Sequence, residues 1–446
     1  MERKILIKNG LIVSMDDQIK NLPKGDILIT DNKIEEVGAS IEVEDAQVID
    51  ANGMIVMPGF VDAHRHLWET NVRGIASDLA FVEYLGTVLG KIAPQYQPDD
   101  VYVGNLLGAL ECINAGITTV FDWSHIMNSM EHTEAAIAGL RDSGIRGVFG
   151  YGTPGTSVWK WFYESKLTHP QNVEKLKLGH FSSQEGNLSL ALCIRGPEYS
   201  TLEVTTADIA YARENNIPVS MHVGCGTFYK RYDAITKLHK NNLLGPDLNF
   251  AHGNFLQAAD LKILADYGCS ISVTPEIEMQ MGLGFPITGE ALRNGLLPSL
   301  GIDVISACGG DMFSQMKIAL QTDRALINNQ HIQNDTMPEK VSITCYDILK
   351  ASTINGAKAV GLDHRTGSIT KGKQADIILL SQENINMKPV SNVYSTIVLQ
   401  SSLADIDTVL VGGKVVKRSG KLLHDKLATL YNKLELSHSR LMSMLQ

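Results

Sequence analysis

The sequence predicts an α/β protein in which eight strand–helix units close a (β/α)8, TIM-like barrel. Two observations carry this prediction. Through the middle of the chain, short β-branched runs alternate with amphipathic helical stretches, and this alternation is typical of parallel strands covered by helices. Both ends of the chain instead consist of short strands separated by turns, which predicts a composite β-sandwich domain assembled from the two termini.

The β-rich ends and the middle of the chain suggest three regions. The first strands are KILIKNGLIV, DILITDNKIEEVG and AQVIDANGMIV, and their NG and DN pairs indicate tight turns. We assign residues 1–56 and 365–421 to the composite β-sandwich domain and residues 57–364 to the barrel. The final segment, 422–446, has helical apolar spacing, so we expect a helical tail that packs on the protein or contacts another subunit.

Eight runs of the middle region are barrel-strand candidates, and helical stretches such as VYVGNLLGALECINAG separate them. The usual alternative, a doubly wound open sheet, carries a GxGxxG phosphate loop that this sequence lacks. In chain order the candidates are IVMPGFVDAH, GITTVFDWS, IRGVFGYG, LSLALCIRG, IPVSMHVG, LNFAHGN, CSISVTPE and PSLGIDVIS.

Composition narrows the class of partner. A formal net charge of −10 without a Lys/Arg block disfavours binding to a nucleic-acid polymer, which needs a concentrated positive surface. The sequence has no signal-peptide pattern and no apolar run of about 18 residues, so we expect no membrane span and a cytoplasmic location. The six cysteines are irregularly spaced and form no CxxC pair, so neither disulfides nor a thiolate metal site is expected. A small-molecule substrate is the predicted partner.

Polar residues at strand ends are the candidates for chemistry, because active sites of such barrels lie at the carboxyl ends of the strands. The first strand ends in His64-Arg65-His66, and residues at i and i+2 of an extended chain point to the same side. The fifth, sixth and eighth strands end in His222, His252 and Asp303. Each alone has the alternative of being a hydrogen-bonded core residue, but together they predict a metal site.

The ligand types indicate which metal. Imidazole nitrogens with one carboxylate suit Zn²⁺, with Fe²⁺ as the alternative, and disfavour Mg²⁺ or Ca²⁺, which prefer oxygen ligands. Water on such an ion ionises near neutral pH and becomes a nucleophile. Asp303 can then accept its proton and pass it to a leaving group.

Several motifs together resemble the amidohydrolase superfamily over essentially the whole chain. Within it, the sequence is similar to the branch containing cytosine deaminase, 8-oxoguanine and pterin deaminases, and the atrazine and hydroxyatrazine hydrolases. The motifs that carry the resemblance are PGFVDAHRH, HVG, AHGN, GID, GSITKGKQADIILL and VLVGGKVVKRSGKLL.

The resemblance implies hydrolytic removal of an amine, halide or similar group from a nitrogen heterocycle such as a pyrimidine, purine, pterin or triazine. It implies one divalent ion held by His64, His66, His222 and Asp303, with His252 positioning or polarising the attacking water. Binuclear relatives use a lysine of the fourth strand, which LSLALCIRG lacks, so one metal is predicted. We also expect a homodimer or higher homo-oligomer.

One departure from the family pattern bears on the reaction. Many deaminases of this branch carry a glutamate shortly after the strand-five histidine, but here His222 is followed by Val-Gly-Cys225-Gly. Two glutamates, Glu276 and Glu278, follow strand seven, and on an extended chain their side chains would point to the same side. Either is a candidate for the missing acid. The alternative is that both are solvated loop carboxylates. The missing acid also favours a second activity, cleavage of an exocyclic amide or other C–N bond.

Other strand-end residues are candidates for substrate contacts, each with a structural role as the alternative. Trp68 and Arg73 follow the HRH motif and can stack on or bind a planar ring, and Arg195 has donors suited to a carbonyl or carboxylate. Cys225 and Asp311 complete the predicted substrate-binding set. Asp122 and His125 end the second strand and are predicted to orient metal ligands.

Other function classes lack their motifs. Neither the HxE with PCxxC pattern of the separate cytidine-deaminase fold, nor HExxH, nor a Walker A loop occurs. A metal-free assembly protein of the same fold is disfavoured because every predicted ligand position is intact.

Overall fold

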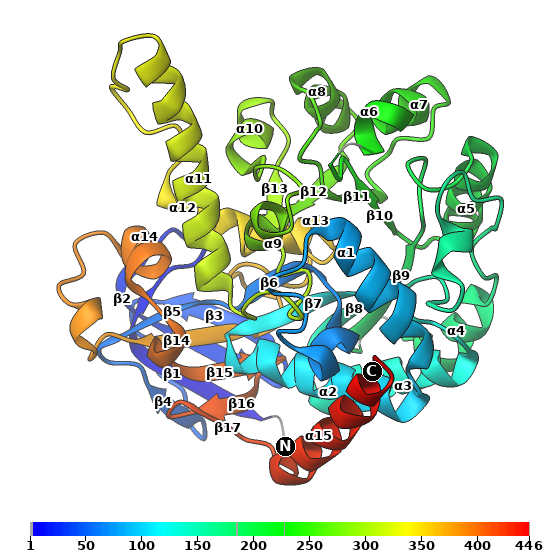
Figure 1. Ribbon diagram of the computed structural model, residues 1–446. Helices are drawn as coiled ribbons and strands as arrows, with labels where there is room; N and C mark the ends of the chain where they lie inside the picture. The colour runs from blue at the N-terminus through cyan, green and yellow to red at the C-terminus, as the bar shows by residue number, and fades with distance from the viewer. Residues whose placement is uncertain (1–2, 184–185, 227, 446) are drawn as a thin grey trace.

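The structure is a computed structural model that describes residues 3–183, 186–226 and 228–445. An eight-stranded parallel sheet forms a barrel, and a nine-stranded sheet built from both ends of the chain lies beside it (Figure 1). The predicted barrel and the composite β-domain from the two termini are both confirmed. The blue N-terminal strands and the orange C-terminal strands form the two halves of this second sheet and meet where β5 pairs with β14, so residues far apart in the sequence are neighbours in space (Figure 1).

The barrel strands follow chain order, and each pairs in parallel with the next. The barrel closes just beyond its last strand, where Asp303 N donates to the His64 carbonyl and His66 N donates to the Asp303 carbonyl, both at 2.9 Å. The eight strands are β6 (Phe60–Arg65), β7 (Ile117–Ser124), β8 (Arg146–Tyr151), β9 (Leu188–Cys193), β10 (Val219–Val223), β11 (Leu248–His252), β12 (Ser270–Val273) and β13 (Pro298–Leu300).

Helices surround the barrel, as the alternating pattern predicts. The longer ones begin at recognisable signals: α2 has a proline at its first position, and Asp311 caps α11 by accepting from Ser314 N at 2.9 Å. They are α2 (Pro98–Asn114), α3 (Met130–Ser143), α4 (Val173–His180), α5 (Leu202–Glu214), α6 (Phe228–Tyr232), α7 (Ala234–Lys240), α8 (Ala258–Asp266), α9 (Pro275–Gln280), α10 (Thr288–Arg293), α11 (Met312–Gln333), α12 (Cys345–Ala351) and α13 (Ile354–Ala359).

Two short elements lie close to the carboxyl end of β6. The 3-10 helix η1 (Leu67–Val72) follows the HRH motif directly and is fully buried. Helix α1 (Phe81–Tyr84) continues into the π-helical turn η2 (Leu85–Ile92).

The second sheet joins the chain ends through antiparallel pairing of β5 with β14, with Met57 opposite Ile378. Most of its buried side chains, among them Ile27, Ile55 and Ile377, are aliphatic. The strands are β1 (Lys4–Ile12), β2 (Leu22–Thr30), β3 (Lys33–Gly38), β4 (Gln47–Asp50), β5 (Met54–Pro58), β14 (Ile377–Ser381), β15 (Ile406–Val411), β16 (Lys414–Arg418) and β17 (Lys421–Leu422), with the single turn α14 (Val393–Ser395) between β14 and β15.

The predicted first barrel strand, IVMPGFVDAH, is two strands in the structure. Its first half is β5 of the terminal sheet, and only the part from Phe60 onward belongs to the barrel. Gly59 marks the division, because a Cβ there would lie 2.1 Å from Thr118 Oγ1 of the adjacent barrel strand. One continuous apolar run therefore serves both sheets, and periodicity alone does not reveal the change of partner.

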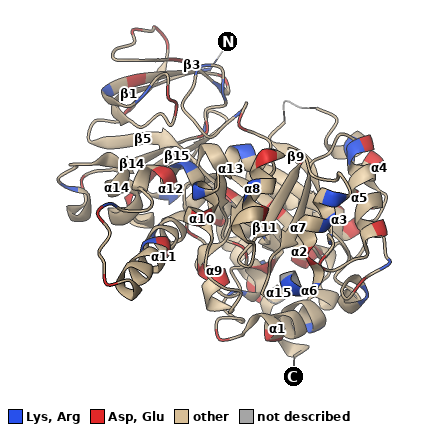
Figure 2. Ribbon diagram, turned by 90° about the horizontal axis from the view of Figure 1, so that it is seen from above, with Lys and Arg blue, Asp and Glu red and all other residues tan. Residues whose placement is uncertain are grey.

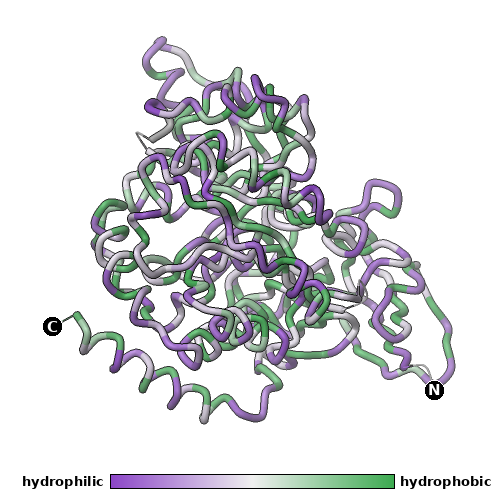
Figure 3. The backbone as a smooth tube through the Cα atoms, turned by 90° about the vertical axis from the view of Figure 1, so that its right-hand side faces the viewer, coloured by the Kyte–Doolittle hydropathy of each residue, from purple (hydrophilic) through white to green (hydrophobic). Residues whose placement is uncertain are grey.

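The C-terminal helix α15 (Leu427–Ser443) lies along the outside of the molecule, and its hydrophobic and hydrophilic residues alternate along the tube (Figure 3). It contacts α2 and η1 through polar groups: Ser437 Oγ donates to Asp100 at 2.6 Å and accepts from Asn71 at 2.5 Å. The predicted helical tail is present and packs on the barrel.

Charged residues of both signs are interspersed over the helices in the view of Figure 2. Among the helices of the described residues, none is both long enough and apolar enough to cross a membrane.

A buried ion pair links the barrel to the terminal sheet. Arg146 of β8 donates from Nε to Asp376 Oδ2 at 2.5 Å and from Nη2 to Asp376 Oδ1 at 3.1 Å. Both side chains are fully buried, and Asp376 also accepts from Gly412 N at 2.7 Å. Removing one partner of such a pair leaves the other charge buried without compensation.

We expect Arg146→Met to lower the free energy of unfolding by about 3–5 kcal/mol, because Asp376 loses its buried counter-ion. Denaturant unfolding followed by circular dichroism measures the change. Lys262→Met is the control, since its pair with Asp266 is largely exposed and its loss costs less than about 1 kcal/mol. Equal effects of the two substitutions would contradict this role.

Candidate metal centre and active site

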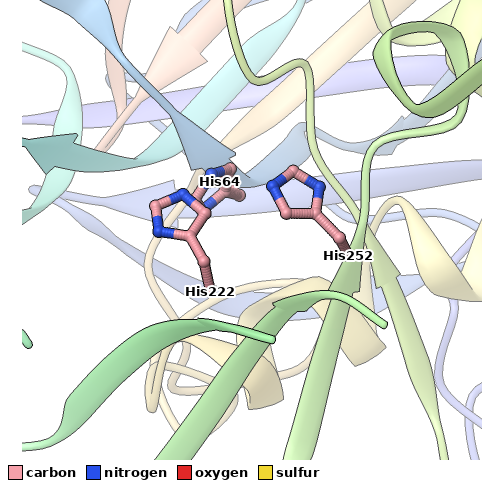
Figure 4. A group of neighbouring side chains, drawn as sticks. All are labelled: His64, His222 and His252. Atoms are coloured by element: carbon pink, nitrogen blue, oxygen red, sulfur yellow. The ribbon is translucent and has the colours of Figure 1, made fainter. Parts of the chain in front are cut away.

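Four histidines and one aspartate converge at the carboxyl ends of the barrel strands. His64 and His66 come from the end of β6, His222 from β10, His252 from the end of β11, and Asp303 from the segment after β13. Figure 4 shows the rings of His64, His222 and His252 turned toward a common point. Nitrogen and oxygen atoms of two overlapping sets, His64 with His222 and His252, and His64 with His66 and Asp303, lie within 4.8 Å of one another.

The HRH motif alternates as an extended strand requires. His64 and His66 face the cluster, with their ring centroids 5.0 Å apart. Arg65 points the other way and pairs with Glu111, Nη2 to Oε2 at 2.5 Å. Behind the strand, Asp62 Oδ1 accepts from His64 N at 3.3 Å and from Ile302 N at 3.1 Å, so one carboxylate ties both sides of the barrel seam.

His252 and Asp303 have strained backbones. Their φ angles are +75° and +70°, in the left-handed region that residues with a Cβ seldom adopt. Such strain costs about 1–3 kcal/mol per residue and persists only where the surroundings impose it. At Asp303 the two hydrogen bonds of the barrel seam do so, and the carboxylate is thereby held beside the histidines.

The hydrogen bonding of His66 requires a cation next to Asp303. His66 Nδ1 donates to the Trp123 carbonyl at 2.6 Å, so in the neutral ring Nε2 carries a lone pair. That Nε2 lies 3.1 Å from Asp303 Oδ1, another acceptor. Two facing acceptors repel unless a proton or a metal ion lies between them, and the Trp123 carbonyl holds His66 in the orientation that creates this need.

His64 supports the same conclusion. Both of its ring nitrogens are buried without a hydrogen-bond partner among the described residues, a costly arrangement for a polar side chain. Burial lowers the pKa of His64 to about 4, and burial with the neighbouring histidines lowers the pKa of His222 well below its usual value. Neutral imidazoles beside a carboxylate are suitable ligands for a divalent metal ion.

His252 is fixed from behind. Its Nδ1 lies 3.0 Å from Thr274 Oγ1 and 3.5 Å from Glu278 Oε1, whereas its Nε2 lies 3.9 Å from Asp303 Oδ2. Glu278 is fully buried and accepts from Thr274 N at 2.7 Å. Glu278 therefore acts on the cluster through His252.

The extended conformation predicted for residues 274–278 is wrong. Pro275–Gln280 forms helix α9, because proline at the first helical position favours helix initiation. Residues two apart on a helix point in different directions, so the two glutamates separate. Glu278 reaches His252, whereas Glu276 Oε2 accepts from Gln315 Nε2 of α11 at 3.0 Å.

A cavity adjoins the cluster and holds about 550 Å³ of empty space, which includes its opening to solvent. One side carries His66, His222, His252 and Asp303, and the remaining wall is largely apolar. Besides those residues it is lined by Phe81, Tyr84, Leu85, Leu89, His125, Phe162, Arg195, Tyr199, Cys225, Ile277, Met281, Leu283 and Val304.

The predicted substrate contacts divide into two groups. Arg195 and Cys225 line the cavity. Trp68 is fully buried and, like Asp311, is not among the cavity-lining residues of the described chain; Trp68 contacts His125 instead, and Asp311 caps α11. The stacking of Trp68 on a substrate ring is therefore not supported, because Trp68 lies on the buried helix η1.

The residues after β7 also differ from expectation. Asp122 accepts from Leu67 N at 3.2 Å and from Asn105 at 2.8 Å, and it holds η1 rather than a metal ligand. His125 lines the cavity, where its ring stacks on that of His66 with centroids 4.1 Å apart.

Two buried glutamates near the site escaped sequence reasoning. Glu198 Oε1 accepts from Gly224 N at 2.7 Å, in the loop that lacks the family's acid, and burial raises its pKa to about 7. Glu69 accepts from Tyr84 at 2.6 Å and from Ser306 at 2.5 Å, and burial raises its pKa to about 7. Each lies three residues after a predicted site residue, Glu198 after Arg195 and Glu69 after His66, and this proximity in sequence could have marked them as candidates.

Comparison with known proteins gives consistent relatives. The model of the amidohydrolase family matches residues 55–416. The chain is 30% identical over 435 residues to 5'-deoxyadenosine deaminase of Methanosphaera stadtmanae, covering 94% of each chain. It is 28% identical over 422 residues to 5-methylthioadenosine/S-adenosylhomocysteine deaminase of Thermococcus onnurineus, covering 92% of this chain and 93% of the relative.

Solved structures share the fold. An adenosine deaminase from Xanthomonas campestris with bound zinc superposes with a TM-score of 0.86 at 20% identity, covering 99% of both chains. Atrazine chlorohydrolase from Arthrobacter aurescens complexed with zinc gives a TM-score of 0.86 at 21% identity, covering 97% of this chain and 100% of the other.

We expect elemental analysis of the purified protein to find about one divalent ion per chain, because the two ligand sets share His64. His222→Asn should lose most of the metal, since it removes one imidazole of the cluster. Glu276→Gln, outside the cluster, should retain it. Two ions per chain, or full occupancy in His222→Asn, would contradict this arrangement.

Proposed function

Because the chain belongs to the amidohydrolase family, we propose that it is a metal-dependent deaminase that hydrolyses the exocyclic amine of a nitrogen heterocycle. The observation that carries the proposal is the position of Asp303. Its carboxylate lies between the β6 histidines and His252, beside the cavity.

Deamination replaces a ring-bound amino group by oxygen: water adds to the carbon, and ammonia leaves. A divalent ion held by His64, His66, His222 and Asp303 would supply a water that ionises near neutral pH. We propose zinc as this ion, with iron as the alternative. Nitrogen-rich ligation supports zinc, and two of the structural relatives contain it.

Asp303 is the proposed proton carrier. Burial acts to raise its pKa, but the contacts with His64 and His66 outweigh burial and hold that pKa well below its usual range. The ionised carboxylate accepts a proton from the attacking water and returns it to the departing nitrogen. We propose that His252, whose Nδ1 is fixed by Thr274 and Glu278, orients the water through Nε2.

The acid that protonates the ring must come from outside the loop after His222. Glu278 supports His252 from behind, so its proposed contribution is through that imidazole. Glu276 contacts Gln315 and lies away from the cluster, which favours the alternative that Glu276 has no catalytic role.

The substrate class follows from the cavity. An apolar wall with few polar groups suits a planar ring such as a pyrimidine, purine, pterin or triazine. We propose that Arg195 and Cys225 contact it. Two relatives are named for 5'-deoxyadenosine and 5-methylthioadenosine, so these adenosine derivatives belong in any first screen.

A second activity has one observation in its favour. Cys225 stands where many relatives carry the acid that assists ring deamination, and its thiol is buried at the cavity. Cleavage of an exocyclic amide, or of another C–N bond that needs no ring protonation, is the alternative.

We also propose a cytoplasmic homodimer or larger homo-oligomer. The six cysteines, all within the described residues, are unpaired thiols, in keeping with a reducing compartment. Exposed Tyr431 and Leu436 on α15 are candidates for a subunit contact.

The main test is ammonia release from a panel of aminopyrimidines, aminopurines, pterins, triazines and the two adenosine derivatives. Asp303→Asn should lower kcat by at least about 10³-fold, because it removes the proton acceptor. Asparagine tolerates the left-handed backbone, so the fold should be retained. Ammonia release from no compound, or an active Asp303→Asn enzyme, would contradict the proposal.

Glu278→Gln and Glu276→Gln form a matched pair. We expect Glu278→Gln to lower kcat by about 10- to 100-fold, the usual effect of losing a group that orients an active-site histidine. Glu276→Gln should stay within about twofold. Steady-state kinetics on the best substrate of the panel measures both, and two equally active variants would refute a role for Glu278.

A further inference from the structure

His125 presents one ring nitrogen to the cavity. It follows β7, its side chain lines the cavity, and its ring is parallel to that of His66 within 8°. Its Nδ1 faces away from the cavity and accepts from Trp68 Nε1 at 3.0 Å. No hydrogen bond to Nε2 is found within the described part of the chain, so this atom is available to a ligand.

Trp68 determines which nitrogen of His125 carries the proton. An indole N–H only donates, so His125 Nδ1 must accept and, in the neutral ring, Nε2 must carry the hydrogen. Trp68 is itself immobilised: it is fully buried, its ring meets Tyr96 edge to face at 4.9 Å, and Tyr96 Oη donates to the Trp68 carbonyl at 3.0 Å. The direction of the His125 N–H is therefore preset.

The neutral form is favoured by the surroundings. Because Nδ1 accepts the indole N–H of Trp68, this nitrogen carries no proton and the ring is neutral. A neutral imidazole with Nδ1 occupied offers the cavity one donor and no acceptor.

Arg195 adds donors to the same cavity. Its Nη2 donates to Thr153 Oγ1 at 2.5 Å, and the guanidinium carbon lies 5.1 Å from the centre of the Phe162 ring. Its Nε is buried without a hydrogen-bond partner among the residues that the structure describes. A buried guanidinium with a free donor is complementary to a carbonyl or anionic oxygen.

We infer that His125, oriented by Trp68, donates Nε2–H to the substrate and, with Arg195, selects heterocycles that carry an oxo or anionic oxygen beside the amino-bearing ring. This inference rests on the proposed deaminase function for the identity of the ring. His125 is a specificity residue that touches substrate, and Trp68 is a positioning residue that acts through it. The adenine ring of the relatives' named substrates has no oxo group, so the inference distinguishes this chain from them.

The test uses pairs of aminoheterocycles that differ by one oxo group: cytosine with 4-aminopyrimidine, 8-oxoadenine with adenine, and pterin with 2-aminopteridine. Calorimetry on the metal-loaded protein should show that the oxo member of at least one pair binds about tenfold or more tightly, the effect of one or two added hydrogen bonds. Ammonia release is measured separately on the same compounds.

Matched variants isolate the donor. His125→Gln places an amide N–H near the position of Nε2 and should keep most of the oxo preference, whereas His125→Phe should reduce it about tenfold. Trp68→Phe should raise KM with little change in kcat, and nitrogen NMR of His125 should show loss of the single Nε2–H tautomer. Metal content should match the wild type in Trp68→Phe and His125→Gln, and both variants should remain folded under the assay conditions, although Trp68→Phe lowers the unfolding midpoint because it shortens a buried side chain.

The outcomes separate the two proposals. Ammonia release with equal affinity in every pair, or an oxo preference unchanged in both His125→Phe and Trp68→Phe, overturns the inference and leaves the deaminase. An oxo preference without ammonia release overturns the deaminase and leaves the specificity assignment. A proton on Nδ1 of His125 in the wild-type spectrum refutes the role of Trp68. If no compound of the panel binds, the inferred substrate class is refuted.

Discussion

The seam that closes the barrel is the interaction on which the site depends. Two backbone hydrogen bonds join the HRH motif to Asp303, and the Asp62 carboxylate binds both sides of the same seam. Without this pairing the eighth strand would not bring Asp303 beside His64 and His66. The cost of a left-handed backbone at Asp303 is offset by the same contacts. The contacts that close the barrel therefore also bring the proposed metal ligands together.

A second constraint is the hydrogen bonding behind the ligands. The Trp123 carbonyl fixes His66, Thr274 and Glu278 fix His252, and the Trp68 indole fixes His125. Each partner is buried and settles which nitrogen of its imidazole faces the cavity. The site thus combines nitrogen lone pairs, which we propose bind a cation, with one imidazole N–H and one guanidinium, which we propose contact the substrate. His66 and His125 present different groups to the cavity, a lone pair and an N–H, because the partner of His66 Nδ1 accepts a hydrogen bond and the partner of His125 Nδ1 donates one.

The loop after His222 differs from the pattern of many deaminases of this family. The loop after His222 carries Cys225 in place of an acid, and Glu198 from the preceding strand–helix unit binds the backbone N–H of that loop. A carboxyl group is thus present beside the loop, although it comes from another part of the sequence.

The sequence alone determined the barrel, the composite second domain and the five residues that converge, because strand ends in a parallel barrel meet at one rim and Asp and His there are unusual. It did not determine which residues lie behind that rim. Three features depend on contacts between segments far apart in the chain. These are the start of α9 in place of a continued strand at residues 274–278, the contact of Trp68 with His125, and the division of IVMPGFVDAH between the two sheets. Local periodicity carries no information about such contacts, so only the tertiary structure decided them.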